Sequence, residues 1–300
     1  MTNSKARVDM LRKLVDKLRS ARDVEKIMLG SILAKNICAS DRQPLSDHEF
    51  KVFSQWGEDG IIQFLLRKLE LPQNTFIEFG VETYREANTR FLLMHDNWSG
   101  LVIDGSKSNI NDIVSQSIYW RYSLNAIQSF ITAENIDETI TNNNMSGEIG
   151  ILSVDIDGND YWVLKAIKNV NPVILISEYN SVFGSERAIS IPYSSDFVRG
   201  QKGLSNLYYG ASLQALTTLA EEKGYSLVGC NSSGNNAFFV RKDKLGDLAP
   251  VSVKDAFVDA KFRESKDKKG KLLLLEGSER YAEIKGLPVI NVITNEVEQL

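Results

Sequence analysis

The sequence predicts an α/β protein with a doubly wound, mostly parallel sheet, an antiparallel hairpin that closes it, and a helical extension at the N-terminus. Apolar segments of strand length alternate with helical segments through the middle of the chain, and such crossover helices imply parallel pairing. The last two strand-like segments, 225–231 and 236–242, are separated only by a short polar turn, which is typical of a hairpin. Residues 5–38 carry apolar side chains at helical spacing.

Composition limits the class of protein. The chain has 300 residues, of which 43% are hydrophobic and 25% charged, enough for one well-cored domain with appendages. Its net charge of −4 argues against a general nucleic-acid binder, so no nucleic-acid partner is expected. The only cysteines are Cys38 and Cys230, which we expect to be two thiols, with a single disulfide as the alternative. His48 and His95 are too few for a multi-histidine metal site.

The sequence divides into three parts: a helical extension (1–45), a main domain (46–245) and a C-terminal appendage (246–300). The polar N-terminus lacks the apolar run of a signal peptide, and no segment approaches the roughly 18 apolar residues of a membrane span. We therefore expect a cytoplasmic protein.

The predicted helix 5–38 has three interpretations. It packs on its own domain, or it joins copies of the chain in a homo-oligomer, although Glu25 and Lys35 interrupt a strict heptad. A membrane-surface helix is the third and weakest interpretation, because acidic residues are interspersed with the basic ones. A linker is expected at 40–50.

The elements of the main domain follow in order. Strands are predicted at 76–80, 100–106, 118–124, 148–157 and 172–180, before the hairpin. Helices are predicted at 86–96, 126–141, 160–168 and 210–223, and 181–205 reads as a long polar loop. In the tail, residues 250–300, we expect a helix and a strand appended to the domain.

Carboxylates end several of these strands, where open α/β sheets bind ligands. Glu78 and Gly80 close the first strand, and a glycine lets the backbone approach a ligand closely. Asp104 follows the next strand about two dozen residues later, as expected for a carboxylate that holds a ribose diol. The alternative for Asp104 is a turn cap beside Gly105.

The densest cluster is Asp155, Asp157 and Asp160. If the strand runs through Asp157, alternation places Asp155 and Asp157 on one side, with Asp160 in the following turn or capping the next helix. Glu178 and Asn180 emerge from the neighbouring strand. Oxygen ligands from adjacent strand ends would suit Mg²⁺ or Mn²⁺, and a metal would lower the pKa of a bound hydroxyl; without one, Glu178 would serve as acceptor or base.

The loop after this strand supplies candidates for an acceptor pocket, because long loops that follow strands often carry specificity. These candidates are Tyr193, Asp196, Arg199, Tyr208 and Tyr209.

Several segments, taken together, resemble the FkbM-like class of S-adenosylmethionine-dependent methyltransferases, over about residues 50–245. The matching segments are SQWGEDGII (54–62), FIEFGVE with EANT (76–82 and 86–89), NWSGLVIDGS (97–106), DIDGNDYWVLKAI (155–167), ISEYN (176–180), YGASLQAL (209–216) and GYSLVGCNSSGNNAFFVRKD (224–243). The resemblance implies a Rossmann-like class I methyltransferase sheet and O-methylation of a sugar or surface-glycan unit.

The resemblance also implies roles for individual residues. S-adenosylmethionine would contact Ser54, Gln55, Glu78, Gly80, Asn88, Asp104, Ser106 and Asp155, with Glu78 and Gly80 at its methionine part. The segment DGNDYW is similar to the metal-binding turn of macrolide-sugar O-methyltransferases, which implies Asp157 and Glu178 as metal ligands. Asp160 would be the base, with Asp157 as the alternative, and Asn180, Tyr193 and Tyr209 would contact the acceptor. The sequence departs from that turn by one extra residue before Asp160 and by EYN in place of paired aspartates.

Two rival hypotheses remain. Asp155-Ile-Asp157 also fits the D-x-D spacing of metal-dependent glycosyltransferases, which hold a nucleotide-sugar diphosphate. The other rival is a non-catalytic scaffold whose N-terminal helix binds a partner.

Overall fold

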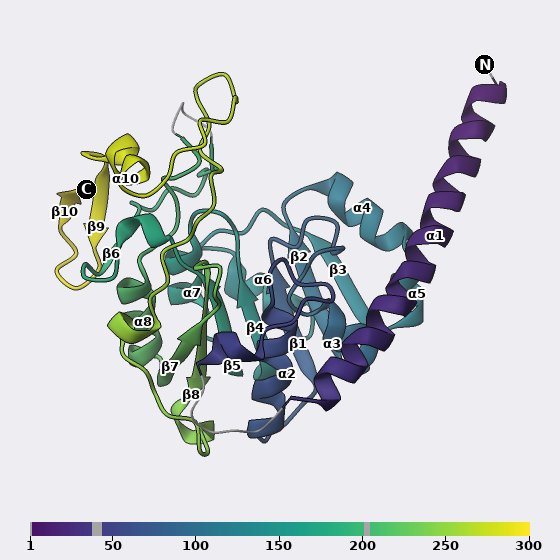
Figure 1. Cartoon of the computed structure of the whole chain (residues 1–300), viewed down its shortest axis with the longest axis horizontal. Coiled ribbons are helices and arrows are strands. Elements are labelled where there is room, and N and C mark those ends of the chain that lie inside the picture. The colour runs from purple at the N-terminus through teal and green to yellow at the C-terminus, as the bar shows by residue number, and fades with distance from the viewer. Residues whose placement is uncertain (1, 38–43, 201–204) are drawn as a thin grey trace.

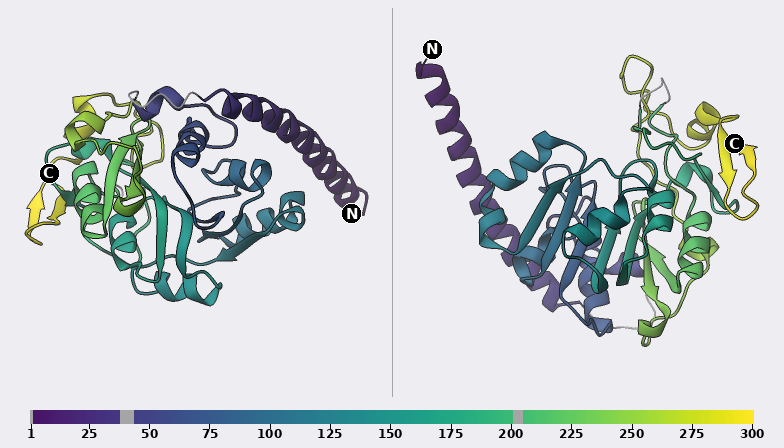
Figure 2. Two further views of the ribbon diagram at one scale, coloured as in Figure 1. Left: turned by 90° about the horizontal axis from the view of Figure 1, so that it is seen from below. Right: turned by 180° about the vertical axis from the view of Figure 1, so that it is seen from behind.

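A seven-stranded mixed sheet covered by helices on both faces forms the centre of the molecule (Figure 1; Figure 2, left). The computed structural model describes residues 2–37, 44–200 and 205–300. The strand order is β3-β2-β1-β4-β5-β8-β7, with β1, β2, β3, β4 and β5 parallel and β8 antiparallel to both β5 and β7. This is the predicted doubly wound, Rossmann-like sheet with a terminal hairpin.

The elements of the sheet and its helices have the following bounds. The strands are β1 (Thr75–Phe79), β2 (Ser99–Asp104), β3 (Leu124–Gln128), β4 (Gly147–Val154), β5 (Val170–Glu178), β7 (Tyr225–Cys230) and β8 (Asn236–Arg241). The helices are α1 (Thr2–Lys35), α2 (Glu58–Lys68), α3 (Arg90–His95), α4 (Lys107–Ser115), α5 (Ser117–Arg121), α6 (Ile136–Asn142), α7 (Asp160–Ala166) and α8 (Leu213–Glu222). Short 3₁₀ turns lie at Leu45–His48, Ser181–Phe183 and Lys242–Lys244.

The tail adds a smaller unit to the domain. It contains α9 (Val253–Ala256), α10 (Ser278–Ile284), β9 (Pro288–Asn291) and β10 (Val297–Gln299). Strand β9 pairs antiparallel with β10 and with β6 (Ile189–Ser190), a two-residue strand in the loop predicted at 181–205. The tail therefore holds two short helices and two strands where one helix and one strand were predicted, and it is joined to the domain through β6.

The central strands are buried on both faces, which explains why their sequences are almost continuously apolar. Ile77 and Leu152 belong to the apolar cluster on one face, and Phe76 and Ile151 to the cluster on the other. Because β1 pairs with both β2 and β4, its carboxyl end lies between theirs, in the middle of the sheet edge.

Two predictions around the third strand were wrong. Residues 118–124 were expected as a strand because Ile, Tyr and Trp favour strands, yet α5 covers most of them. Ile118 is buried and Trp120 is 73% exposed, which is the one-sided burial of a short surface helix. The strand is 124–128, so the helix expected at 126–141 begins only at Ile136.

Helices α2 and α4 were not predicted. Gly60 weakens the helical pattern of α2, but a Cβ there would lie 2.0 Å from the carbonyl oxygen of His48, so packing requires the glycine. Ser106 caps α4 by accepting a hydrogen bond from the amide of Asn109.

The N-terminal helix α1 was predicted correctly as a helix, and its N-terminal half projects beyond the domain in both views (Figures 1 and 2). Part of the linker expected at 40–50 forms the 3₁₀ turn at 45–48; residues 38–43, including Cys38, lie outside the described residues. Cys230 is a buried thiol. Among the described residues, no helix combines the length and apolar content needed to cross a membrane.

Candidate functional site

Two cavities lie next to each other at the carboxyl edge of the parallel strands. The first, of about 560 Å³, contains Asp155, Asp157 and Glu178 in its wall, and we call it the triad cavity. The second, of about 430 Å³, is lined by Asp104 and is called the Asp104 cavity. The residues that line both are Gly80, Glu82, Asp155, Asp157 and Arg199. The cavities therefore share one wall.

In the Asp104 cavity the carboxylate is held by donors. One oxygen of Asp104 accepts the amide of Glu82 (2.8 Å), and the other accepts the amide of Ser106 (2.7 Å) and the Asn109 side chain (3.0 Å). Apolar side chains, among them Phe130 and Ile131, complete the cavity. Asp104 and Ser106, both predicted to contact the cofactor, thus line one cavity, and Asp104 also organises the turn, which was its alternative role.

The shared wall depends on Gly80. Its φ is +70°, a conformation that favours glycine, and a Cβ there would lie 1.7 Å from the carbonyl oxygen of Asp155. The backbones at the ends of β1 and β4 are therefore in direct contact, and no side chain fits between them.

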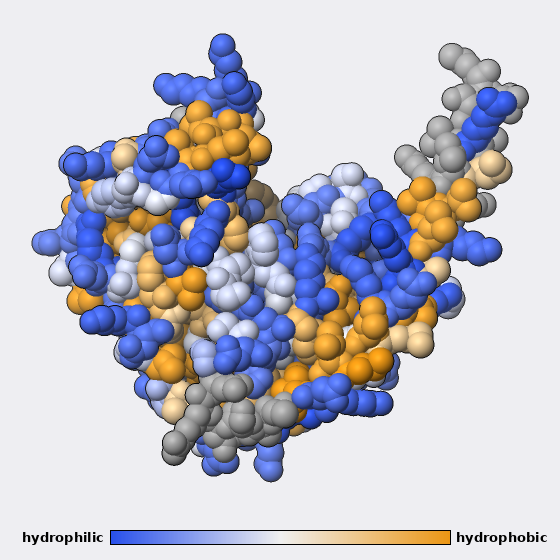
Figure 3. All heavy atoms as spheres, in the orientation of Figure 1, coloured by the Kyte–Doolittle hydropathy of each residue, from blue (hydrophilic) through white to orange (hydrophobic). Residues whose placement is uncertain are grey.

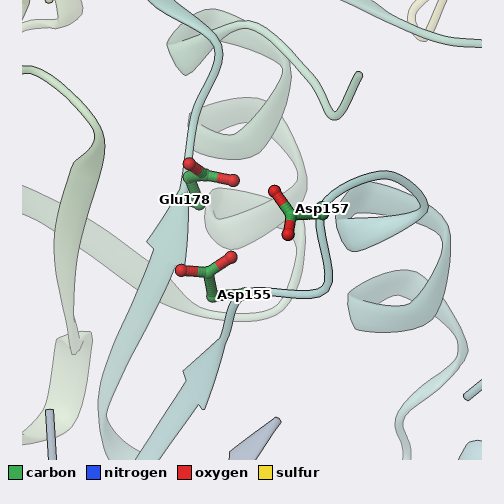
Figure 4. Close-up of side chains that lie close together, drawn as sticks. All are labelled: Asp155, Asp157 and Glu178. Carbon is green, nitrogen blue, oxygen red and sulfur yellow. The ribbon is translucent and has the colours of Figure 1, made fainter. Parts of the chain in front are cut away.

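Asp155, Asp157 and Glu178 converge on one point, and we call these three the triad. Each offers a carboxylate oxygen that lies within 4.8 Å of the oxygens of the other two. Figure 4 shows their side chains pointing toward one another from the end of β5 and from the segment between β4 and α7. The proximity of Asp155 and Asp157 was predicted correctly, but for a wrong reason: β4 ends at Val154. Asp157 turns inward because it adopts a left-handed conformation, with φ +57°.

The buried carboxylates of the triad have too few hydrogen-bond donors and positive charges around them to balance their negative charge. Burial, together with the negative charges of Asp157 and Asp160, raises the pKa of Asp155 well above its usual value. Burial and the charge of Asp155 raise the pKa of Glu178 in the same way. The Oε2 atom of Glu178 is buried and has no hydrogen-bond partner. Such a group requires a cation, a donor or a proton, and the three oxygens fit the ligand set of Mg²⁺ or Mn²⁺.

Asp160 holds the turn that carries Asp157. Its two oxygens accept the amides of Ile156 (2.8 Å) and Gly158 (2.9 Å), and its side chain is fully buried at the start of α7. Burial raises the pKa of Asp160 to about 6. It does not line either cavity, so the structure does not bring the predicted base to the ligand space.

Arg199 supplies the positive charge in the wall. Its guanidinium forms ion pairs with Asp157 and, at 2.6 Å, with Glu264 of the tail. It also lies over the ring of Tyr209, 3.6 Å from the centroid, and the Tyr209 hydroxyl donates to Glu178 over 3.4 Å. Arg199 and Tyr209 were predicted to lie near an acceptor, and both lie against the triad.

Glu78 faces the triad cavity from the end of β1. Its oxygens accept the amides of Asn88 (2.8 Å) and Thr89 (3.0 Å), and the Thr89 hydroxyl (2.5 Å). Burial nevertheless raises its pKa to about 7. Asn88 also donates to the Ser153 hydroxyl, which ties the segment before α3 to β4. Glu78, Asn88 and Gln55 all line the triad cavity.

Other predicted residues lie elsewhere. The buried Ser54 bonds to Asp59, and Asn180 donates to the carbonyls of Leu207 and Tyr209, so both shape loops. Tyr193 donates to Glu134 and accepts the amide of Ala133, away from both cavities. Two further candidates also lie outside the cavity walls: Asp196, which bonds to Ser194, and Tyr208, which donates to the carbonyl of Pro288.

Several residues of the triad cavity were not among the predicted site residues. Trp56 is stacked on Phe262 with 4.8 Å between ring centroids, and both line the triad cavity. Phe262 and Glu264 come from the tail, which had been assigned to an appendage. The aromatic residue inside the charged run KFRE was the available signal.

No protein-family model matches the sequence, and no curated protein matches it. Solved structures with similar coordinates include the N-terminal domain of EvdMO1 with SAH bound (TM-score 0.40, 11% identity, 63% of this chain and 80% of that chain). A second is an S-adenosylmethionine-dependent methyltransferase from Clostridium acetobutylicum ATCC 824 (TM-score 0.39, 11% identity, 61% and 90%). A third is an O-methyltransferase from Bacillus cereus in complex with SAH (TM-score 0.39, 14% identity, 73% and 89%). Similarities at this level do not indicate what the chain does. The fold is assigned from the strand order of the sheet.

Proposed function

We propose that the chain is an S-adenosylmethionine-dependent O-methyltransferase that acts on a hydroxyl of a sugar or surface-glycan unit. The observation that carries the proposal is the pair of cavities with a common wall at the carboxyl edge of the seven-stranded sheet. A group-transfer enzyme needs its donor and its acceptor on two sides of one short gap.

The Asp104 cavity suits the nucleoside of the cofactor. Asp104 lines this cavity as a hydrogen-bond acceptor whose orientation is fixed by two backbone amides and Asn109, and such an acceptor suits a ribose diol. Phe130, Ile131 and Phe197 offer apolar surface for a purine ring. The methionine part would then extend past Gly80 toward Glu78, where a glycine permits close approach.

The triad cavity suits a sugar. The stacked pair of Trp56 and Phe262 presents an aromatic surface, against which the C–H face of a pyranose packs. Trp56 is 43% exposed, so this surface is accessible. Polar side chains, including Asn235 and Glu86, surround it and can bond to ring hydroxyls.

The reaction would use the residues at the wall. S-adenosylmethionine, held in the Asp104 cavity, would supply the methyl group and keep the electron pair of the broken carbon–sulfur bond, while Asp157 would take the proton of the acceptor hydroxyl. We assign this proton to Asp157, because its side chain is 57% exposed toward the ligand space while both oxygens of Asp160 are occupied. A divalent cation on Asp155, Asp157 and Glu178 would lower the pKa of the acceptor hydroxyl.

Calorimetric titration tests the proposal. We expect S-adenosylmethionine to bind the wild-type protein, and the Asp104→Ala variant to bind it about 10- to 100-fold more weakly, because hydrogen bonds to an ionised group are lost. Asp112→Ala, at a half-exposed surface ion pair with Arg85, is the matched control. Binding of nucleotide sugars but not of S-adenosylmethionine would contradict the proposal and support the glycosyltransferase alternative.

The substrate class needs a separate readout. Mass spectrometry of glycans from cells with and without the protein should show the loss of one methyl group per modified unit. Unchanged glycans in the presence of measurable cofactor binding would reject the glycan acceptor and leave the methyltransferase assignment intact.

A further inference from the structure

Many of the exposed large apolar side chains of the described chain lie on α1. Of the large hydrophobic side chains on this helix, those exposed by 41–67% are Met10, Leu14, Val15, Leu18, Val24, Met28, Leu29, Ile32 and Leu33. Figure 3 shows apolar surface along the domain-proximal half of this helix and again near its middle. A helix that is apolar on the packed side and on the open side is normally covered on both.

Two opposite stripes run along α1. The inner stripe packs on the domain: Asp23 forms an ion pair with Arg90, a Cβ on Gly30 would collide with Val52, and Arg67 donates to the carbonyl of Ala34. Together with Ile27, these residues occupy positions 23, 27, 30 and 34, which are spaced by four, three and four residues. The outer stripe is Leu14, Leu18, Ala21, Glu25, Met28 and Ile32, with alternating spacings of four and three. In a heptad the outer set occupies positions a and d, directly opposite the inner set.

We propose that the outer stripe binds the same stripe of a second copy of this chain, with the two α1 helices antiparallel. Reversing one helix about a two-fold axis between residues 21 and 25 places Leu14 beside the partner's Ile32. The same operation places Leu18 beside the partner's Met28. Every large apolar residue of the outer stripe then meets an apolar residue, over about 28 Å of helix.

Charge complementarity selects this register. Glu25 is the polar interruption of the outer stripe, and the antiparallel pairing places it next to the partner's Arg22, once on each side of the two-fold axis. Both residues are exposed and, within the described chain, neither forms an ion pair. A parallel pairing would instead place Glu25 beside the partner's Glu25, with like charges in the centre of the interface.

The shape of the chain permits this arrangement. The N-terminal half of α1 projects free of the domain, while the other half lies on it with its outer stripe open (Figures 1 and 2). Each projecting half therefore covers the open half of the partner. Because the domains lie on the inner stripes, they are on opposite outer sides of the helix pair and do not collide.

Light scattering tests the assembly. We expect a mass twice that of the 33.6 kDa chain. Arg22→Glu and Glu25→Arg should each raise the dissociation constant roughly tenfold, since both symmetry-related pairs become repulsive. The double variant that carries both changes should recover the wild-type value. A monomer at tens of micromolar, or single variants that dissociate no more than the wild type, would overturn the proposal. Unchanged melting temperatures show that the variants fold.

Cysteine cross-linking tests the direction. In a Cys38→Ser background, Leu18→Cys combined with Met28→Cys should form interchain disulfides on mild oxidation, because antiparallel pairing brings these positions together. Leu18→Cys alone should remain uncross-linked. Cross-linking of the single variant would show parallel helices and overturn the antiparallel dimer. Since cofactor binding is not involved, these outcomes are independent of the proposed catalytic function.

Discussion

The Asp104 cavity and the triad cavity are built on neighbouring strand ends, yet their carboxylates are compensated differently. Asp104 accepts three hydrogen bonds, from the Glu82 amide after β1 and from Ser106 and Asn109, which follow it in the sequence. In the triad, Oε2 of Glu178 has no partner, and the strongest positive charge comes from Arg199 of a distant loop. A carboxylate with fixed donors is ready for a neutral polar ligand. A cluster that lacks them is completed only by what binds there, a cation or a proton-donating acceptor.

Replacing Asp157 should give the largest effect. Asp157→Asn removes the proton acceptor and one ligand of the triad, and we expect methyl transfer to fall by about 10²- to 10⁴-fold with S-adenosylmethionine affinity nearly unchanged. Steady-state kinetics and calorimetry together measure this separation. Asp247→Asn, at an exposed position that lines neither cavity, is the matched control. An equal loss of S-adenosylmethionine affinity would contradict the assignment of the cofactor to the Asp104 cavity and of the acceptor to the triad cavity.

Steady-state kinetics also tests whether the triad binds a divalent cation. Exhaustive chelation should lower the activity of the wild-type enzyme, and added Mg²⁺ or Mn²⁺ should restore it. Full activity after chelation would assign the triad to proton transfer alone.

A substitution in the wall between the cavities should give the next largest effect, a loss of stability. Gly80→Ala would introduce a Cβ 1.7 Å from the carbonyl oxygen of Asp155 at a φ of +70°, and should destabilise the fold by about 3 kcal/mol. Calorimetry should show a melting temperature lower by about 8 °C. Gly105→Ala is the control, because a Cβ there meets Phe130 at an ordinary 3.4 Å. Equal melting temperatures for both variants would show that the backbone at Gly80 and Asp155 can shift to accommodate a Cβ at little cost in stability.

The pH dependence of stability should show the smallest effect. The pKa of Glu78 is about 7 in the folded state and ordinary in the unfolded state, so the folded state binds more protons between these values. Stability therefore falls as the pH rises through this window. We expect Glu78 to contribute a loss of about 2 kcal/mol between pH 5.5 and 7.5.

Denaturant unfolding of Glu78→Gln should isolate this contribution. The fall in unfolding free energy with pH should become shallower by that amount, whereas Glu138→Gln on the exposed surface should keep the wild-type slope. An unchanged slope in Glu78→Gln would mean that its three donors outweigh its burial.

The fold was predictable because the strands are either alternating or continuously apolar and because the crossover helices separate them. The errors arose where packing overrides local preference. Residues 118–121 contain strand-forming side chains but form a helix, because Ile118 and Tyr119 pack against the apolar cluster on one side while Trp120 is exposed to solvent. Helix α2 was missed because Gly60 disfavours a helix in the local sequence. Its role is to allow close approach to the carbonyl of His48, which no local pattern reveals.

The site was predictable as far as strand ends determine it. Glu78, Asp104, Asp155 and Glu178 follow from the rule that parallel strands share one carboxyl edge. The inward direction of Asp157 depends on a left-handed backbone that Asp160 stabilises, and a residue count cannot show it. Phe262 and Glu264 reach the cavity from a segment remote in sequence, so only the folded tail brings them there.

The shared wall has a thermodynamic consequence. Gly80 and Asp155 line both cavities, so in the proposed function a ligand in one cavity would contact the same backbone layer as a ligand in the other. Two ligands bound across such a layer are energetically linked, and linkage is reciprocal. Whatever factor the cofactor gains in affinity from a bound acceptor, the acceptor gains from the cofactor. Each affinity measured alone would therefore differ from the affinity in the ternary complex by the same ratio.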